Sequence, residues 1–274
     1  MAESEMATKF DQLVKHIDQP GIDSDPERDI LKFRPGVTPT EAQAIQMAVK
    51  RRRAAAGDRI VGHQASFTSP SMRALYPDSP FPMVGTLLSS MIRTDDDLIE
   101  LESDQAAIES ELAVILRKDL AGPDLSPIEV LAAIEGFLPA IEVAPIRSKL
   151  GSGPFSWPHM IACQKAYGGF IVLGPKITSA KGIDPRLEGC LVTIDGVAKA
   201  GAIGAEAMGN PLLVIAAMAK TLHGIGEKLC ASQVVLTGSL PPPQLVSKAS
   251  SRVATVEFQT LGSVSIRLKP TVDE

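Results

Sequence analysis

The chain has 274 residues, of which 45% are hydrophobic and 22% charged, an ordinary composition for a globular protein. A formal net charge of −5 and only 4% aromatic residues argue against a nucleic-acid partner, and no apolar stretch reaches the ~20 residues of a membrane helix. The three cysteines form no CxxC pair, and the acidic N-terminus has no apolar signal segment, so we expect a cytoplasmic protein without disulfides.

The first strong pattern is a helix in "TPTEAQAIQMAVKRRRAAAG". Thr38 or Thr40 can serve as its N-cap, Glu41 lies in its first turn, and Gly57 ends it. The basic run Lys50–Arg53 is interpreted as the solvated end of this helix, where cations also suit the helix dipole.

Strand patterns follow. "RIVGHQASF" predicts a strand, and "TSPSMRALYPDSPFPMVG" predicts a loop with one helical turn. Short β-like runs then recur in "ESELAVIL", "AIEVAPI", "GFIVLGPKI", "CLVTIDGVAKAGA", "SQVVLTGSL" and "VATVEFQTLGSVSIRL". Asp195-Gly196 is a two-residue hairpin signal. One helix interrupts these strands, from Pro211 to about Lys228, with Asn210 as its cap.

Early helices and late strands predict an α+β fold, with a curled sheet, barrel or sandwich rather than a doubly wound sheet. We divide the chain into an N-terminal helical α/β region over residues 1–58 and a β-rich catalytic domain over residues 59–274.

Three glutamates stand in apolar strand-like runs, where an unpaired charge is costly. Because side chains alternate along a strand, Glu109 and Glu111 share one face, while Ser110 and Leu112 point the other way. Glu142 lies in a second run, "LPAIEVAPI". Three carboxylates on neighbouring strands repel one another unless a cation neutralises them, and hard oxygen ligands suit Mg²⁺, Mn²⁺ or Ca²⁺.

An E-x-E pair followed about thirty residues later by an acid in an apolar strand resembles the fumarylacetoacetate hydrolase superfamily. The likeness is to its branch of 2-keto-4-pentenoate hydratases and 4-oxalocrotonate decarboxylases. "VGHQASFTSPSMRAL" is similar to the branch's G-x-K-x-G-x-T-S segment, Gly85-Thr86-Leu87 to its G-T-L, and "NPLLVIAAMAKTL" and "VVLTGSL" to its late helix and the next strand. The resemblance covers most of the chain. It implies a mixed, barrel-like β-roll and Mg²⁺ or Mn²⁺ on Glu109, Glu111 and Glu142.

The chain departs from this branch at two positions. Gln64 stands where the branch has a lysine, and Met83 where it tends to have an aspartate. "QKAYGGFIVLGP" resembles a segment of the superfamily's hydrolases and puts Lys165 where a lysine helps to bind or polarise the substrate. Lys165 and Gln64 are therefore the candidate catalytic residues, although Lys165 also fits a surface lysine at a helix end. His63 is turned away from the site if Gln64 faces it.

Small polar residues near the resembled substrate loop and at the end of a late strand are candidate substrate-binding residues, with loop capping and a plain turn as the alternatives. They are Ser66, Thr68, Ser69, Thr237, Gly238 and Ser239.

The resemblance implies a metal-dependent hydratase that acts on a small 2-hydroxy-2,4-dienoate or 2-oxo-enoate, as a homo-oligomer and without a nucleic-acid or membrane partner. A 4-oxalocrotonate-type decarboxylase is the first alternative. An acylpyruvate C–C hydrolase is a second, favoured by Lys165. It is opposed because "FTSPSMRALYP" lacks the His–Glu pair with which some hydrolases of the superfamily activate water. A non-catalytic homologue or assembly partner is a third.

Overall fold

The computed structural model describes residues 10–15, 17–18, 35–75, 82–101, 103–146 and 169–269. Candidate residue Lys165 lies outside this described part. Among the described helices we find none with the length and apolar character of a membrane span.

Most of the described strands belong to one nine-stranded mixed sheet. Its members are β1 (Ile60–Ser66), β2 (Met83–Leu88), β3 (Ile92–Thr94), β5 (Gln105–Leu116), β6 (Ile134–Pro145), β7 (Phe170–Leu173), β8 (Thr178–Ser179), β11 (Val234–Ser239) and β12 (Gln244–Ser247). The order is β2-β1-β11-β5-β6-β7-β3, with β12 paired to β5 and β8 to β6. The pairs β1–β11 and β3–β7 are parallel, and the other pairs are antiparallel.

A second sheet has five strands in the order β10-β9-β13-β14-β4. They are β4 (Leu98–Ile99), β9 (Gly189–Ile194), β10 (Val197–Ile203), β13 (Val253–Phe258) and β14 (Gly262–Leu268). The β9–β10 hairpin turns at Asp195 and Gly196, both with positive φ, so the hairpin predicted from this dipeptide is confirmed.

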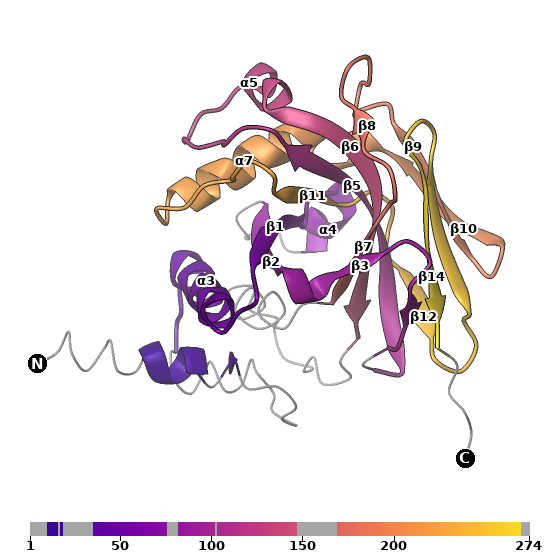
Figure 1. The fold of residues 1–274 in the computed structure, drawn as a ribbon, viewed down its shortest axis with the longest axis horizontal. Helices are drawn as coiled ribbons and strands as arrows, with labels where there is room; N and C mark the ends of the chain where they lie inside the picture. Colours follow the sequence, from indigo (N-terminus) through magenta and orange to yellow (C-terminus); the bar gives the residue numbers. More distant parts are fainter. Residues whose placement is uncertain are drawn as a thin grey trace, which may run out of the picture.

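The described helices are α3 (Pro39–Ala55), α4 (Pro70–Leu75), α5 (Pro127–Ala132) and α7 (Pro211–His223), with two 3₁₀ turns, η1 (Ser89–Met91) and η2 (Gly204–Glu206). Figure 1 shows α3 and α7 on one side of the nine-stranded sheet and the five-stranded sheet on the other. In agreement, α3 and α7 contact β2, and β13 and β14 contact β6. The predicted α+β fold with a curled sheet is confirmed. The division of the chain into an N-terminal region and a β-rich domain between residues 58 and 59 stays a prediction.

Helix α3 begins as its sequence predicts. Thr38 is the N-cap and forms a capping box with Glu41, so Thr40 lies inside the helix. The interpretation of Lys50 as a solvated residue is wrong: its side chain is fully buried, with Nζ 3.6 Å from Met91 Sδ. Only the following arginines reach the surface, because Lys50 lies on the face of α3 that packs on the sheet.

Three expected boundaries also need correction. Met83 begins strand β2 rather than ending a loop, because the apolar run 83–88 pairs along its whole length with β1. Helix α7 ends at His223, before Lys228, since Gly224 forms its C-cap. Strands β5 and β6 are longer than the short runs expected from the sequence, with 12 residues each.

The two faces of β5 have different partners. Ile108, Leu112 and Val114 belong to the large core that includes residues of the five-stranded sheet, such as Val192. Ala113 belongs to a separate core on the opposite face, the concave core. This core consists of Leu87, Leu88, Met91, Ala113, Leu138, Ala140, Ile171, Val234 and Leu236. Ser110 also faces the five-stranded sheet, where it lies beside Cys190, a thiol whose pKa is raised by burial. The expected alternation along β5 is therefore confirmed.

Candidate metal centre

The three predicted glutamates converge on the concave face of the large sheet. Glu109 and Glu142 are Cα partners on β5 and β6, and Glu111 follows on the same face of β5. One carboxylate oxygen from each residue lies within 4.8 Å of the other two. Glu111 and Glu142 are buried, and Glu109 is half-buried. Acids, histidines and cysteines are the usual metal ligands, and among the described residues these three glutamates are the group whose oxygens have the spacing of a metal site.

The convergence depends on a bulge in β11. Leu236 pairs with Ala113 but Ser239 pairs with Glu111, so one extra residue is inserted in β11 between these pairs. Gly238 adopts φ of +92° there and donates its N–H to Glu111 Oε2 at 2.7 Å. A Cβ at this glycine would lie 2.2 Å from Thr68 Oγ1, so only glycine fits both the backbone and the space.

Gln64 reaches the acids from β1. Its Nε2 donates to Glu142 Oε1 at 3.0 Å. The strands that carry these residues are three positions apart in the sheet, about 14 Å if it were flat. The hydrogen bond therefore requires a strongly curled sheet, in which β1 faces β6 across the concave side. Gln64 Oε1 is buried and has no hydrogen-bond partner among the described residues.

His63 and Met83 bring no charged group to the acids. His63 points away from the acids, and its Nδ1 lies 3.4 Å from Thr86 Oγ1. Burial lowers the pKa of His63 to about 4, so the imidazole is neutral. Met83 is buried and is the Cα partner of Ser66. Within the described residues, β1 and β2 thus bring no carboxyl, amine or imidazole group to the acids.

The candidate substrate-binding residues differ in their hydrogen bonding. Thr237 Oγ1 donates to Leu112 O at 3.0 Å, and Ser239 Oγ donates to Pro241 O at 2.8 Å. Thr68 is buried and its hydroxyl has no hydrogen-bond partner among the described residues. The structure therefore brings the Thr68 hydroxyl close to Gly238, whose N–H bonds Glu111, while the Thr237 hydroxyl is bonded to the backbone of β5.

Ser66 and Ser69 lie at the two ends of the same loop. Ser66 is half-buried at the end of β1, and Ser69 is buried, with its carbonyl accepting from Arg73 N in α4. The role of Gly238 as a donor to a glutamate is not predicted from the sequence, which indicates Gly238 only as a candidate substrate-binding residue. A glycine after Thr237 in an apolar strand was the available signal, because glycine in a strand often marks a bulge.

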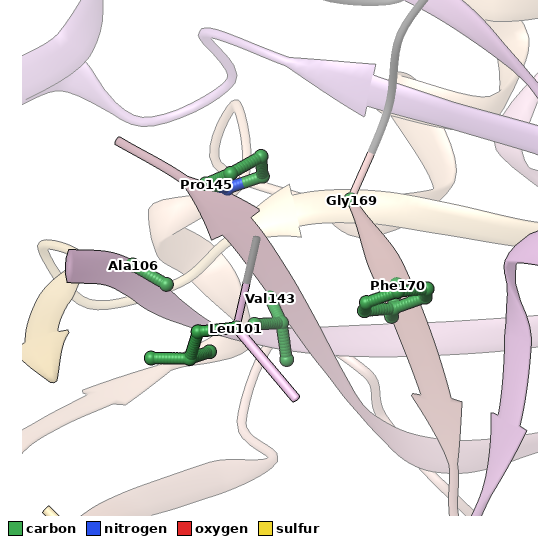
Figure 2. A pocket seen from close by; sticks show the side chains of 6 residues that line it. All are labelled: Leu101, Ala106, Val143, Pro145, Gly169 and Phe170. Atoms are coloured by element: carbon green, nitrogen blue, oxygen red, sulfur yellow. The ribbon is translucent and has the colours of Figure 1, made fainter. Parts of the chain in front are cut away.

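A small apolar pocket lies on the other face of the sheet. Figure 2 shows Ala106 on β5, Val143 on β6 and Phe170 on β7 lining it together with Leu101, Pro145 and Gly169. Val143 adjoins Glu142, so alternation places this pocket and the carboxylates on opposite faces of β6. The pocket is therefore separate from the candidate metal centre.

Comparisons with known proteins agree with this geometry. The family model described as fumarylacetoacetate (FAA) hydrolase C-terminal matches residues 53–269. A 2-keto-4-pentenoate hydratase of Burkholderia vietnamiensis is 32% identical over 234 residues, which cover 84% of this chain and 86% of the relative. A 4-oxalocrotonate decarboxylase of Pseudomonas putida is 28% identical over 257 residues, covering 93% and 95% of the two chains.

A solved structure shows the same fold over nearly the whole chain. It is the 4-oxalocrotonate decarboxylase from Pseudomonas putida G7 complexed with magnesium and adipate, with a TM-score of 0.84 and 25% identity over 96% of this chain and 98% of that chain. The chain therefore belongs to the fumarylacetoacetate hydrolase superfamily, in the branch of the 2-keto-4-pentenoate hydratases and 4-oxalocrotonate decarboxylases.

Proposed function

We propose that the protein is a divalent-metal-dependent hydratase acting on a small 2-hydroxy-2,4-dienoate or 2-oxo-enoate. The observation that carries the proposal is the convergence of Glu109, Glu111 and Glu142 within 4.8 Å, in a chain similar to named hydratases of this branch. The wider assignments, a homo-oligomer in the cytoplasm, rest on this likeness and on the composition.

The donor set fits Mg²⁺ or Mn²⁺. Three carboxylate oxygens are hard ligands, and two of them come from buried side chains beside the apolar concave core, where an uncompensated charge is costly. Glu109, Glu111 and Glu142 would hold the ion. When bound, it would supply Lewis acidity towards the 2-oxo and carboxylate groups of a substrate.

The chain's own groups prepare this site. Gly238 N–H fixes one oxygen of Glu111, and Gln64 fixes one oxygen of Glu142, so both carboxylates are oriented before a ligand binds. The buried hydroxyl of Thr68 lies beside Gly238 and is the candidate that the structure best supports for holding a substrate carboxylate. The apolar concave core excludes water from one side of the site.

A substrate comparison tests the proposal. The protein would be incubated with Mg²⁺ or Mn²⁺ and, separately, 2-hydroxypenta-2,4-dienoate, 4-oxalocrotonate and an acylpyruvate, and the loss of each chromophore followed. We expect the dienoate to be consumed by hydration and Glu111→Gln to abolish this activity. Consumption of the acylpyruvate alone would establish a C–C hydrolase, and Mn²⁺ binding without any turnover would establish a non-catalytic homologue.

The second candidate is a 4-oxalocrotonate decarboxylase. It is favoured by the structural likeness over 96% of the chain to an enzyme of that name. Release of CO₂ from 4-oxalocrotonate, with no hydration of the dienoate, would identify this reaction in place of the first.

A further inference from the structure

We infer that Phe67 and Met208 are positioning residues of the metal centre. Both have a left-handed backbone conformation, and the two turns that they form hold Thr68 against Gly238, whose N–H orients Glu111. The inference rests on the proposed metal site, and it assigns to that site two residues from outside the acid cluster.

The backbone of these two residues is unusual. The angle φ is +58° at Phe67 and +54° at Met208, a region in which Cβ crowds the backbone. The other described non-glycine residues with positive φ carry short polar side chains, and they are Asp96, Asp195 and Ser232. A bulky apolar residue stays in this conformation only where surrounding contacts impose it, and such residues cluster at functional sites.

A backbone hydrogen bond joins the two turns at Thr68. Phe67 lies between β1 and α4, whereas Met208 lies much later in the chain, between η2 and α7. Met208 N–H donates to Thr68 O at 3.1 Å and is shared with Glu206 O at 3.0 Å. Phe67 is buried, and Met208 is half-buried against the large core. Thr68 is therefore held by the turn that precedes it and by the turn before α7.

Thr68 passes this constraint on to a metal ligand. Its side chain lies over Gly238, because a Cβ added to this glycine would collide with Thr68 Oγ1 and lie 3.1 Å from Thr68 Cγ2. Gly238 N–H in turn donates to Glu111 Oε2 at 2.7 Å. Thr68 thus limits how far the bulge of β11 can shift, and the bulge sets the direction of the Glu111 carboxylate. Loss of a group that orients a ligand typically weakens metal binding by about 10–100-fold.

Apolar packing is the alternative role for Phe67 and Met208, and two substitutions separate the roles. Asparagine adopts the left-handed conformation readily but is polar, whereas valine is apolar but its branched Cβ disfavours positive φ. If the backbone conformation positions the site, Phe67→Asn and Met208→Asn should keep Mn²⁺ affinity within about 2-fold of the wild type. Phe67→Val and Met208→Val should each weaken Mn²⁺ binding by about 10-fold. Packing alone predicts that the valine variants are the milder ones.

The experiment is a calorimetric titration of each full-length protein with Mn²⁺, without substrate, together with a thermal melt in chelator. Ser232→Val is the matched control. Ser232 is exposed, has φ of +67° and lies in the turn before β11, at the opposite end of this strand from the bulge. The substitution creates the same backbone conflict, so it should lower the melting temperature but leave Mn²⁺ affinity unchanged.

Wild-type Mn²⁺ affinity in both valine variants overturns the inference alone. A loss of about 10-fold in both asparagine variants also overturns it, because the side chains and not the backbone would then matter to the site. If a valine variant does not fold, the asparagine variants decide in the same way, since they remove the apolar side chains and keep the backbone conformation. Absence of Mn²⁺ binding by the wild type overturns the proposed function as well.

Discussion

Replacement of Glu111 by glutamine should raise the stability of the metal-free protein and remove its response to metal. Glu111 and Glu142 lie within 4.8 Å, and at an effective dielectric constant of about 20 such a pair repels by about 3 kcal/mol. The half-buried Glu109 adds a smaller, screened contribution. Against this, the charge-assisted bond from Gly238 N–H becomes a neutral one, a loss of about 1 kcal/mol. From these contributions alone, the net gain is about 2 kcal/mol.

For a chain of this size, 2 kcal/mol corresponds to a rise in melting temperature of about 4–8 °C. The assay is a thermal melt of the wild type and Glu111→Gln, each in a chelator and in Mn²⁺. Mn²⁺ at 100 times its dissociation constant stabilises the wild type by about 2.7 kcal/mol, whereas the variant should not respond. The variant should therefore melt above the wild type in chelator and below it in Mn²⁺.

Glu135→Gln is the matched control, because Glu135 is an exposed glutamate at the start of β6, outside the acid cluster. It should change neither melting temperature. The reasoning is refuted if Glu111→Gln melts below the wild type in chelator while keeping its full Mn²⁺ response, since the three acids would then neither repel one another nor share an ion.

Three further predictions concern residues around the site. His63 has a pKa of about 4 in the fold against 6.5 for the free side chain, so its stabilising effect is complete above pH 6.5 and is lost as the pH falls towards 4. In urea unfolding, the free energy of unfolding of the wild type should be about 2 kcal/mol lower at pH 5 than at pH 7, and this difference should be smaller in His63→Gln. Equal differences in both proteins would contradict the low pKa. Gly238→Ala should destabilise the protein by more than about 2 kcal/mol, and Thr68→Ala in the same chain should recover part of this, because the contact at 2.2 Å is relieved while the positive φ remains. A double-mutant cycle measured by chemical unfolding checks this, and stability changes of the two single variants that simply add in the double variant would contradict it. Thr237→Val should cost about 1–2 kcal/mol by leaving Leu112 O without its donor, yet leave Mn²⁺ affinity unchanged; weaker Mn²⁺ binding at unchanged stability would instead assign Thr237 to the site.

Local rules were sufficient for much of the fold and for the position of the acids. The capping box at Thr38 and the Asp195-Gly196 hairpin are decided within a few residues of chain, and so is the shared face of Glu109 and Glu111. The contact of Gln64 with Glu142 depends instead on the curl of the whole sheet between β1 and β6.

The burial of Lys50 also depends on contacts between distant parts of the chain, which local sequence patterns do not predict. A basic run at a helix end has the composition of a solvated segment, and only the packing of α3 on the sheet shows that its first member is buried.

The departures at Gln64 and Met83 leave one question about the proposed reaction, the origin of the proton that hydration of a double bond requires. Within the described residues, β1 and β2 bring no proton donor to the acids, because Gln64 is an amide, Met83 a thioether and His63 faces away. Lys165, predicted from its sequence context, is a candidate for this donor, and it lies outside the described part. If it serves as the proton donor, Lys165→Met should lower kcat by about 100-fold or more.

The same variant should keep its Mn²⁺ affinity within about 2-fold of the wild type, because a proton donor is not needed to hold the ion. Lys165→Arg separates a role of this lysine as a positive charge from a role as a proton donor, since a guanidinium keeps the charge but does not release a proton near neutral pH. Recovery of KM without recovery of kcat in this variant would assign proton transfer to Lys165. Unchanged kcat in Lys165→Met would exclude this lysine as the proton donor, and the hydratase proposal would then need a donor that neither β1 nor β2 supplies.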